Sequence, residues 1–292
     1  MIKSDVTYLA RPSGNVIFTS ADSNYFKLFS DQLIISLDKV DCYSSLHIHV
    51  INPDQEALYK LQQLLRKFKR LTASFEHVDI KKLMDLSTHA NSDWLKNIPL
   101  NILEMLAIEH VRAKYIKRKL FKIALRIGIS AKFLISKKRL HSDAIRVYYA
   151  CRRFSLIQEF FTSIDTLIVV DIDSVCKNEN FRHELDSSNC ILAPKRIGSW
   201  STYLAGFVYY PDNKEASLFI DHFSEKLTEF FENGWIFWGL DQYLLDVIST
   251  KNSISGLHES VFGLKDGDDS SFISYKGDAK YLEKGYKRRF IA

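Results

Sequence analysis

The chain has 292 residues and a net charge of +5, and its sequence is 46% hydrophobic and 26% charged. This composition excludes a disordered chain, and the length suits one large globular domain or two small ones. The four cysteines show no C-x-x-C spacing, which favours reduced thiols over a disulfide scaffold or a thiolate metal site. The start of the sequence lacks the apolar core of a signal peptide, and no uncharged apolar window of about 18 residues follows. We therefore expect a cytoplasmic protein that is soluble or peripheral at the inner face of a membrane.

Over roughly the first 80 residues, short apolar strands alternate with amphipathic helices. A strand over 16–18 runs into a helix that extends through Leu37, and a second strand covers 45–52. A helix is then predicted over 53–68, and SFEHVDI (74–80) is predicted to be a third strand. Because parallel strands need crossover connections, this alternation predicts an α/β fold with a mostly parallel sheet covered on both faces.

A strongly basic segment interrupts this alternation. From 110 to 153 the sequence has fourteen Lys or Arg and one acid, and from 98 to 128 apolar residues recur at helical spacing. We interpret 85–145 as a helical, basic insertion within a single domain that spans 1–292. The composition of 110–140 suits an anionic membrane surface, while a homodimer interface and a lid over a diphosphate remain open alternatives. Nucleic acid is not an expected partner, because no recognition motif accompanies the charge.

After the insertion, the sequence predicts three strands, three helices and a polar tail. In chain order these are a helix around 148–161, strands over 166–173, 189–195 and 202–211, helices over 211–234 and 238–250, and a loop-like tail over 271–289.

The first of these strands ends in two carboxylates, Asp171 and Asp173. In a strand both would point to the same side, and at the carboxyl end of a parallel strand that side opens on the crevice where α/β sheets bind ligands. Two oxygen ligands there suit Mg²⁺ or Mn²⁺. The stretch VVDIDSV also fits the signature of haloacid dehalogenase-like phosphatases, in which Asp171 would be the nucleophile. A calcium loop is excluded, because the glycine that D-x-D-x-D-G requires is missing after Asp173.

Five short motifs occur along the chain: SADSNY (20–25), ACRRF (150–154), YLAGFVYY (203–210), LDQYLL (240–245) and SYKGDAK (274–280). Together with the strand that ends in the two aspartates, they resemble the retaining glycosyltransferases of the glycogenin and bacterial lipooligosaccharide galactosyltransferase type. The resemblance implies the GT-A fold, a Rossmann-like α/β architecture. It also implies metal-dependent transfer of a hexose from a UDP-sugar to a glycan or lipid-linked glycan acceptor, with retention of configuration.

The resemblance assigns donor-binding roles to residues that match the family's motifs. Asp22, Asn24 and Tyr25 would hold the base and ribose of the uridine nucleotide, and Arg153 would reach the donor. Chemically, Asp22 can accept a hydrogen bond from a base N–H, and the Tyr25 ring can stack. Asp22 also fits a second interpretation, in which it caps the helix that follows the strand.

The resemblance places the remaining chemistry at the two aspartates and in the LDQ motif. Asp171 and Asp173 would coordinate Mn²⁺ or Mg²⁺ on the donor diphosphate and neutralise the charge of the departing nucleotide. Gln242 would stabilise the positive charge at the reacting carbon, and Asp241 would orient the sugar or an acceptor hydroxyl. The open alternative is that both side chains lie on a solvent-exposed helix face.

Two positions depart from the family pattern. The family's C-terminal H-x-x-G-x-x-K supplies a metal ligand and a lysine to the diphosphate, and here Gly277 and Lys280 match while Ser274 replaces the histidine. Serine is a poor neutral ligand for Mn²⁺. The asparagine that contacts the donor sugar is replaced by Leu204. These departures keep open a third alternative, a donor-binding scaffold without catalytic activity.

Overall fold

The computed structural model describes residues 4–40, 44–83, 137–195, 201–233, 236, 239–249, 254–264 and 269–274, with the backbone alone over 137–143. The helical insertion predicted over 85–145 and the membrane-facing segment predicted over 110–140 therefore fall almost wholly outside the described residues. Gly277 and Lys280 also lie outside them.

The chain folds around an eight-stranded sheet whose strands are β1 (Val6–Ala10), β2 (Gly14–Asp22), β3 (Ser45–Ile51), β4 (Leu71–Glu76), β5 (Ile164–Val170), β7 (Ile191–Pro194), β8 (Phe207–Pro211) and β9 (Ile254–Leu257). Their order across the sheet is β1-β4-β3-β2-β5-β8-β7-β9. The run β4-β3-β2-β5 is parallel and so is β7 with β9, whereas β1 and β8 are antiparallel to their neighbours. The predicted α/β fold with a mostly parallel sheet is confirmed.

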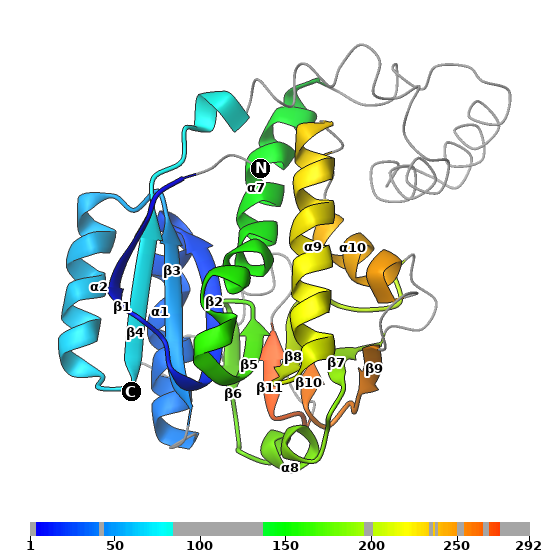
Figure 1. Ribbon diagram of the computed structural model, residues 1–292. Helices are drawn as coiled ribbons and strands as arrows, with labels where there is room; N and C mark the ends of the chain where they lie inside the picture. The colour runs from blue at the N-terminus through cyan, green and yellow to red at the C-terminus, as the bar shows by residue number, and fades with distance from the viewer. Residues whose placement is uncertain are drawn as a thin grey trace, which may run out of the picture.

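Helices cover both faces of the sheet, as Figure 1 shows. They are α1 (Ser23–Val40) and α2 (Gln55–Lys67) on one face, and α7 (Lys137–Leu156), α9 (Lys214–Glu232) and α10 (Leu240–Ser249) on the other. Side chains of the central strands alternate between these two cores: Phe18 and Val169 join the one that includes α7 and α9, while Ile17 and Ile168 join the one that includes α1. Because both faces of β2 and β5 are buried, each strand contains an uninterrupted apolar stretch, 16–18 in β2 and 167–170 in β5.

A second sheet lies next to the end of β5. Its strands are β6 (Ser174–Cys176), β10 (Phe262–Gly263) and β11 (Phe272–Ser274), in the order β10-β11-β6, and the short helix α8 (Phe181–Asp186) packs beside it. The loop predicted from residue 271 onward is wrong for 272–274. Phe272 and Ile273 are fully buried there, and this strand depends on pairing with β6 rather than on any local period.

Several element boundaries differ from the predictions. The helix predicted around 148–161 begins at Lys137, within the segment assigned to the insertion, and ends at Leu156. Two 3₁₀ turns, η2 (Ile157–Glu159) and η3 (Phe161–Ser163), complete the connection to β5. The strand predicted over 74–80 is β4, which ends at Glu76, and the strand predicted to reach Asp173 ends at Val170.

The start of α9 is fixed by a side-chain cap. Asn213 Oδ1 accepts from the Ala216 N–H at 2.8 Å, and its Nδ2 donates to the Asn189 carbonyl at 2.8 Å. We expect Asn213→Ala to lower the free energy of unfolding by about 1 kcal/mol, measured by urea denaturation. Ser217→Ala, one turn into the same helix, is the matched control and should change it by less than about 0.5 kcal/mol. Equal costs for the two variants would contradict the capping role.

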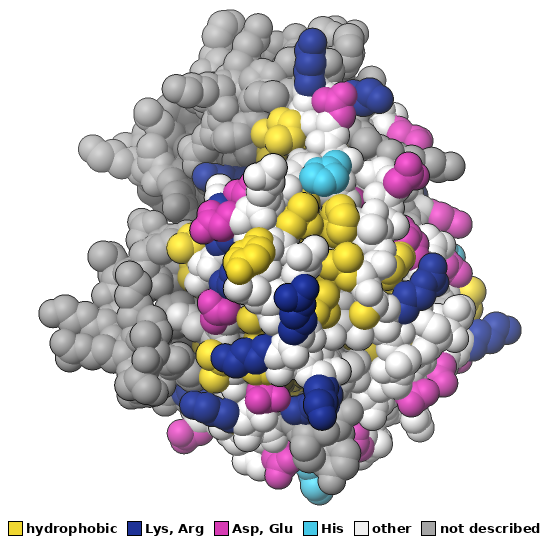
Figure 2. Space-filling view, turned by 90° about the vertical axis from the view of Figure 1, so that its left-hand side faces the viewer, with side chains coloured by type: hydrophobic (Ala, Val, Ile, Leu, Met, Phe, Trp, Pro, Cys, Tyr) yellow, Lys and Arg dark blue, Asp and Glu magenta, His cyan; other side chains and the backbone are white. Residues whose placement is uncertain are grey.

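The side of the molecule on which α2 lies carries interspersed charges of both signs and scattered hydrophobic side chains (Figure 2). Some of these charges are paired, as Lys27 is with Asp54 and Glu56, and Lys60 with Asp31. The described residues on this side therefore do not create a field of one sign, which phosphate-rich partners would favour. Among the helices that the structure describes, none has the length and apolar character needed to cross a membrane.

Candidate active site

The two aspartates of the D-x-D motif lie in the turn between β5 and β6. Val170 is the last residue of β5, the Asp171 carbonyl accepts from the Ser174 N–H at 3.0 Å, and the Asp171 N–H donates to the Gly206 carbonyl at 3.2 Å. The expectation that strand alternation orients both side chains is therefore wrong, because neither aspartate belongs to the strand. The location is the expected one, since the carboxyl end of β5 lies in the middle of the sheet, between β2 and β8.

The pairing of β11 with β6 brings a hydroxyl to the same turn. Ser274 Oγ lies 3.3 Å from Asp173 Oδ1 and 3.5 Å from Asp171 Oδ2, so both carboxylates converge on it. Asp173 is 7% exposed, whereas the Asp171 side chain is 36% exposed. Ser274 thus occupies the place that the resemblance gives to a metal-binding histidine.

These three groups fit a hard divalent cation. Two carboxylates and one hydroxyl form an all-oxygen donor set, which Mg²⁺ and Mn²⁺ prefer and complete with water and phosphate oxygens. Within the described ranges, no group of three or more His, Cys, Asp or Glu side chains could hold a metal. Asp171 and Asp173 would therefore hold an ion with less help from the protein than a histidine would give.

Arg153, in the last turn of α7, is buried between two acids. Its Nη1 pairs with Asp171 Oδ1, and its Nη2 donates to Asp241 Oδ2 at 3.1 Å. Burial alone would lower the pKa of Arg153, but the two carboxylates outweigh burial and raise it, so the guanidinium is a permanent cation. Its Nε is buried and finds no hydrogen-bond partner among the described residues. The side chain predicted to reach the donor therefore joins the D-x-D turn to α10.

Asp241 and Gln242 begin α10 and differ in their surroundings. Asp241 is 6% exposed, and its Oδ1 accepts from the Gln242 N–H at 2.9 Å. Burial raises the pKa of the Asp241 carboxyl, and Arg153 opposes that rise. Burial also raises the pKa of the Cys151 thiol, and the neighbouring Asp241 adds to the shift. The alternative of a solvent-exposed Asp241 is wrong, whereas Gln242 is half-buried.

The predicted nucleotide segment lies on the adjacent strand, where β2 passes into α1. Asp22 Oδ1 accepts from the backbone N–H groups of Asn24 at 2.8 Å and Tyr25 at 2.9 Å. The capping role of Asp22 is thereby confirmed. The cap also fixes the direction of the whole carboxylate. Tyr25 packs against Phe29 with ring centroids 5.3 Å apart, and the binding of a uridine nucleotide by these residues stays a prediction.

Leu204, which replaces the family's asparagine, is a core residue. It is 6% exposed, belongs to the apolar cluster that includes Phe207 and Val261, and its N–H donates to the Pro194 carbonyl at 2.9 Å. Leu204 therefore contributes apolar packing to this cluster, where an asparagine would offer a polar side chain.

The sequence analysis assigned no role to Gly206, although this glycine lies within the YLAGFVYY motif, directly before the apolar run of β8. A Cβ there would lie 2.9 Å from Asp171 Oδ2 and 3.1 Å from Phe262 Cζ. We expect Gly206→Ala to displace the Asp171 carboxylate and to lower the free energy of unfolding by about 1–3 kcal/mol, measured by chemical denaturation. Gly256→Ala is the control: its Cβ would meet the side chain of Lys195, which is exposed and can move. A cost no larger than that of the control would refute this close approach.

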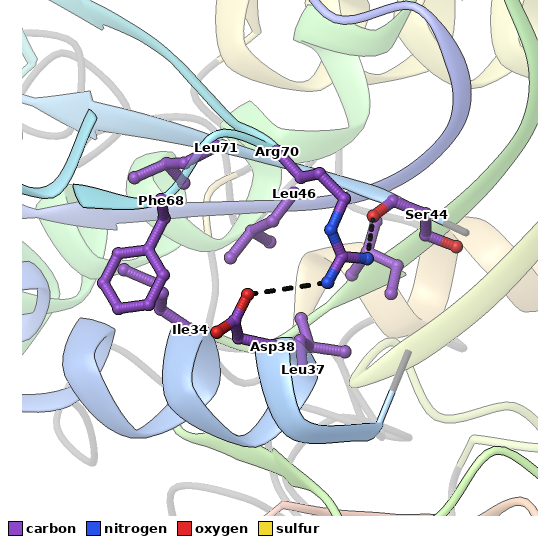
Figure 3. Close-up of a pocket in the computed structure, with 9 residues that line it drawn as sticks. Ile34, Leu37, Asp38, Ser44, Leu46, Phe68, Arg70 and Leu71 are labelled. Atoms are coloured by element: carbon purple, nitrogen blue, oxygen red, sulfur yellow. Dashed lines mark hydrogen bonds and ion pairs between the residues drawn. The ribbon is translucent and has the colours of Figure 1, made fainter. Parts of the chain in front are cut away.

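A separate hollow lies at the opposite, amino ends of the parallel strands. Figure 3 shows apolar side chains of α1, β3 and β4 around it, with Arg70 directed toward Asp38 and the Ser44 carbonyl. The predicted site residues are not part of its lining. The candidate active site is therefore the cluster at the carboxyl end of β5.

No protein-family model matches the chain, and a comparison with curated protein sequences finds no match. Solved structures do match. The glycosyltransferase GlyE of Streptococcus pneumoniae TIGR4, in its apo form, is 12% identical with a TM-score of 0.50, over 93% of this chain and 56% of that one. This chain thus spans little more than half of the GlyE chain.

Two further structures have the same TM-score. The bifunctional glycosyltransferase WbbM is 14% identical with a TM-score of 0.50, over 91% of this chain and 46% of that one. The galactosyltransferase LgtC, solved with donor and acceptor sugar analogs, is 14% identical with a TM-score of 0.50, over 94% of both chains. The eight-stranded sheet, its helices and this likeness over nearly the whole chain agree with the fold that the motifs imply. The protein has the GT-A glycosyltransferase fold.

Proposed function

We propose that the protein is a metal-dependent glycosyltransferase that moves a hexose from a UDP-sugar to a glycan or glycolipid acceptor, with retention of configuration. The observation that carries the proposal is the convergence of Asp171, Asp173 and Ser274 with the Arg153–Asp241 pair at the carboxyl end of β5. This edge is where sheets of this kind bind ligands, and the fold is shared with glycosyltransferases.

At the donor, the proposal uses the D-x-D turn and the start of α1. Asp171 and Asp173, with the Ser274 hydroxyl, would hold Mn²⁺ or Mg²⁺, and the ion would supply neutralisation of the diphosphate charge. Asp22, whose direction is fixed by the helix cap, accepts a base N–H, and Tyr25 offers a ring face. Asn24, Gly277 and Lys280 are also proposed to bind the donor, and this part of the proposal is supported only by their places in the motifs.

At the reacting carbon, the proposal uses the start of α10. The Asp241 carboxylate is held by Arg153 and by the Gln242 N–H, so it can orient a sugar or acceptor hydroxyl without moving. The Gln242 amide oxygen is the group proposed to stabilise the positive charge that develops on the sugar. Front-face attack by the acceptor hydroxyl then needs no strong protein nucleophile.

The experiment that tests the proposal is a thermal-denaturation screen with Mn²⁺, UDP and a panel of UDP-sugars, followed by assays of UDP release and sugar transfer. We expect stabilisation by UDP only with the metal present, loss of that stabilisation in Asp171→Asn and Asp173→Asn, and no action on a generic phosphate ester. Phosphatase activity that Asp171→Asn abolishes, without UDP binding, would instead support the dehalogenase-like alternative.

A second candidate function is a donor-binding scaffold without catalytic activity. Two observations favour it: Ser274 stands in the place of a histidine, and one oxygen of the Asp171 carboxylate is already paired with Arg153. The same assays separate the two candidates: binding of UDP-sugars without hydrolysis or transfer to any of a set of glycan and glycolipid acceptors would support the scaffold.

The acceptor and location form a separate part of the proposal. We place the protein in the cytoplasm at the inner face of a membrane, with 110–140 on anionic lipid and a lipid-linked glycan as acceptor. In a flotation assay, the protein should rise with vesicles that contain anionic lipid and not with neutral ones. Failure to float at moderate salt would contradict membrane binding. The basic segment would then be better explained as a homodimer interface or as a lid over the diphosphate.

A further inference from the structure

Among the described residues, acidic side chains outnumber basic ones in the cluster at the D-x-D turn. Arg153 pairs with Asp171 and Asp241, and Asp173 meets Asp171 at the Ser274 hydroxyl. Carboxylate oxygens are the ligands that hard divalent cations prefer, so this group of side chains is suited to bind such an ion.

The two ion pairs of Arg153 are unequal. Asp241 has a side chain that is 8% exposed, and its second oxygen is held by the Gln242 N–H. The Asp171 side chain is 36% exposed, so water and ions reach it. Ion pairs open to solvent are weak, whereas breaking a buried pair is costly. Of the two contacts, the one with Asp171 is the one that gives way first.

A divalent cation at the turn would compete with Arg153 for this same carboxylate. Asp171 Oδ1 is paired with the guanidinium, while Oδ2 faces Ser274 and is confined on another side by Gly206. An ion held by Asp171 and Asp173 would stand close to the buried guanidinium, and like charges at short range in a place of low polarity repel strongly. Asp171 therefore cannot satisfy both cations equally well.

We propose that Arg153 is the internal counter-cation of Asp171, that a divalent cation displaces it from this carboxylate, and that the displaced guanidinium, still anchored by Asp241, then faces the donor diphosphate. This inference rests on the proposed function and deepens it. Arg153 acts first as a competitor of the metal and then as a ligand of the nucleotide. Metal and nucleotide then bind with positive coupling, because the nucleotide stabilises the displaced arginine.

The test is the affinity for Mn²⁺ alone, measured without nucleotide from the electron paramagnetic resonance signal of the free ion. We expect Arg153→Met to bind Mn²⁺ about tenfold or more tightly than the wild-type protein, since one charge-assisted hydrogen bond no longer competes. Asp241→Asn should bind it more weakly, because Arg153 is then left to Asp171 alone. Arg146→Met, which removes an exposed charge from the same helix, is the control and should change the affinity by less than about twofold.

The double variant Arg153→Met with Asp241→Asn separates direct competition from the total charge. It keeps the net charge of the cluster and does not leave Asp241 as a buried carboxylate without its arginine, so it serves where Arg153→Met alone fails to fold. Tighter Mn²⁺ binding in the double variant supports displacement.

A wild-type protein that binds Mn²⁺ and UDP, with Arg153→Met or the double variant binding Mn²⁺ no more tightly, overturns the inference and leaves the proposed function intact. A wild-type protein that binds neither Mn²⁺ nor UDP overturns the proposed function itself. Mn²⁺ affinity that UDP does not increase in the wild-type protein also contradicts the coupling.

Discussion

Arg152→Met is expected to lower the free energy of unfolding by about 3–5 kcal/mol, because it leaves a buried carboxylate without its counter-charge. Arg152 Nε lies 2.8 Å from Glu76 Oε1 and 3.0 Å from Oε2, and the two side chains are 5% and 0% exposed. The Tyr148 hydroxyl and Ser4 Oγ also contact Glu76. This pair ties α7 to the end of β4, so its loss should be visible in urea denaturation.

Two further variants make the measurement specific. Arg70→Met removes an arginine that pairs with Asp38 at 3.5 Å with both side chains partly exposed, and it should cost less than about 1 kcal/mol through the lost ion pair. Replacing Glu76 by Gln together with Arg152→Met removes both buried charges and should recover much of the loss. If Arg152→Met costs no more than Arg70→Met, the buried pair does not have the importance assigned to it here.

The second large effect is a loss of stability as the pH falls from 6.5 towards 3. Burial lowers the pKa of His47 from 6.5 to about 3, and the neighbouring His49 adds to the shift. Its ring nitrogens lie 2.9 Å from Thr72 Oγ1 and Ser74 Oγ. Between pH 6.5 and 3, His47 therefore binds a proton in the unfolded chain and not in the folded protein. Stability from this group is complete above pH 6.5 and declines by up to about 1.4 kcal/mol per pH unit below it.

Urea denaturation at pH 7, 6 and 5 measures this decline. Burial also lowers the pKa of His49. Burial alone would raise the pKa of Glu76, but His49 and Arg152 outweigh it and hold the pKa at about 2, so the stability that Glu76 gives is lost only below its usual 4.5. The decline between pH 6.5 and 4.5 is therefore assigned to the buried histidines, and Asp241, whose pKa is raised by burial, opposes it. His47→Gln should roughly halve the slope there, with His222→Gln, on the exposed side of α9, as the control. An unchanged slope in His47→Gln would show that this side chain is not the origin.

The sequence was sufficient for the parts of the fold whose strands are buried on both faces. β2 and β5 contain uninterrupted apolar stretches, and β3 is apolar except for Ser45, His47 and His49. Amphipathic helices follow or precede these strands, so their existence and their parallel arrangement follow from local pattern. β6, β9 and β11 have three or four residues each and are set by pairing partners far away in the chain. Such strands carry too few residues for a period to be recognised.

The sequence was sufficient to propose individual residues of the candidate site, but not the ion pairs that join them. The motifs identify Asp171, Arg153 and Asp241 individually, but the two ion pairs join positions 18 and 88 residues apart, and no local rule links them. The Glu76–Arg152 pair, separated by 76 residues, was missed for the same reason. Residue type indicates which groups can ionise, whereas only the fold decides which of them neutralise one another.

The antiparallel pairing of β6 with β11 has a consequence for the growing chain on the ribosome. Ser274 follows Asp173 by 101 residues, so at about 5–20 residues per second the hydroxyl is made about 5–20 s after the carboxylates. During that interval β2, β3, β4 and β5 can already pair, because all four precede β6 in the chain. The nascent protein can thus possess its central sheet well before the two aspartates acquire their third oxygen neighbour, which makes the proposed ion site one of the last features to form during synthesis.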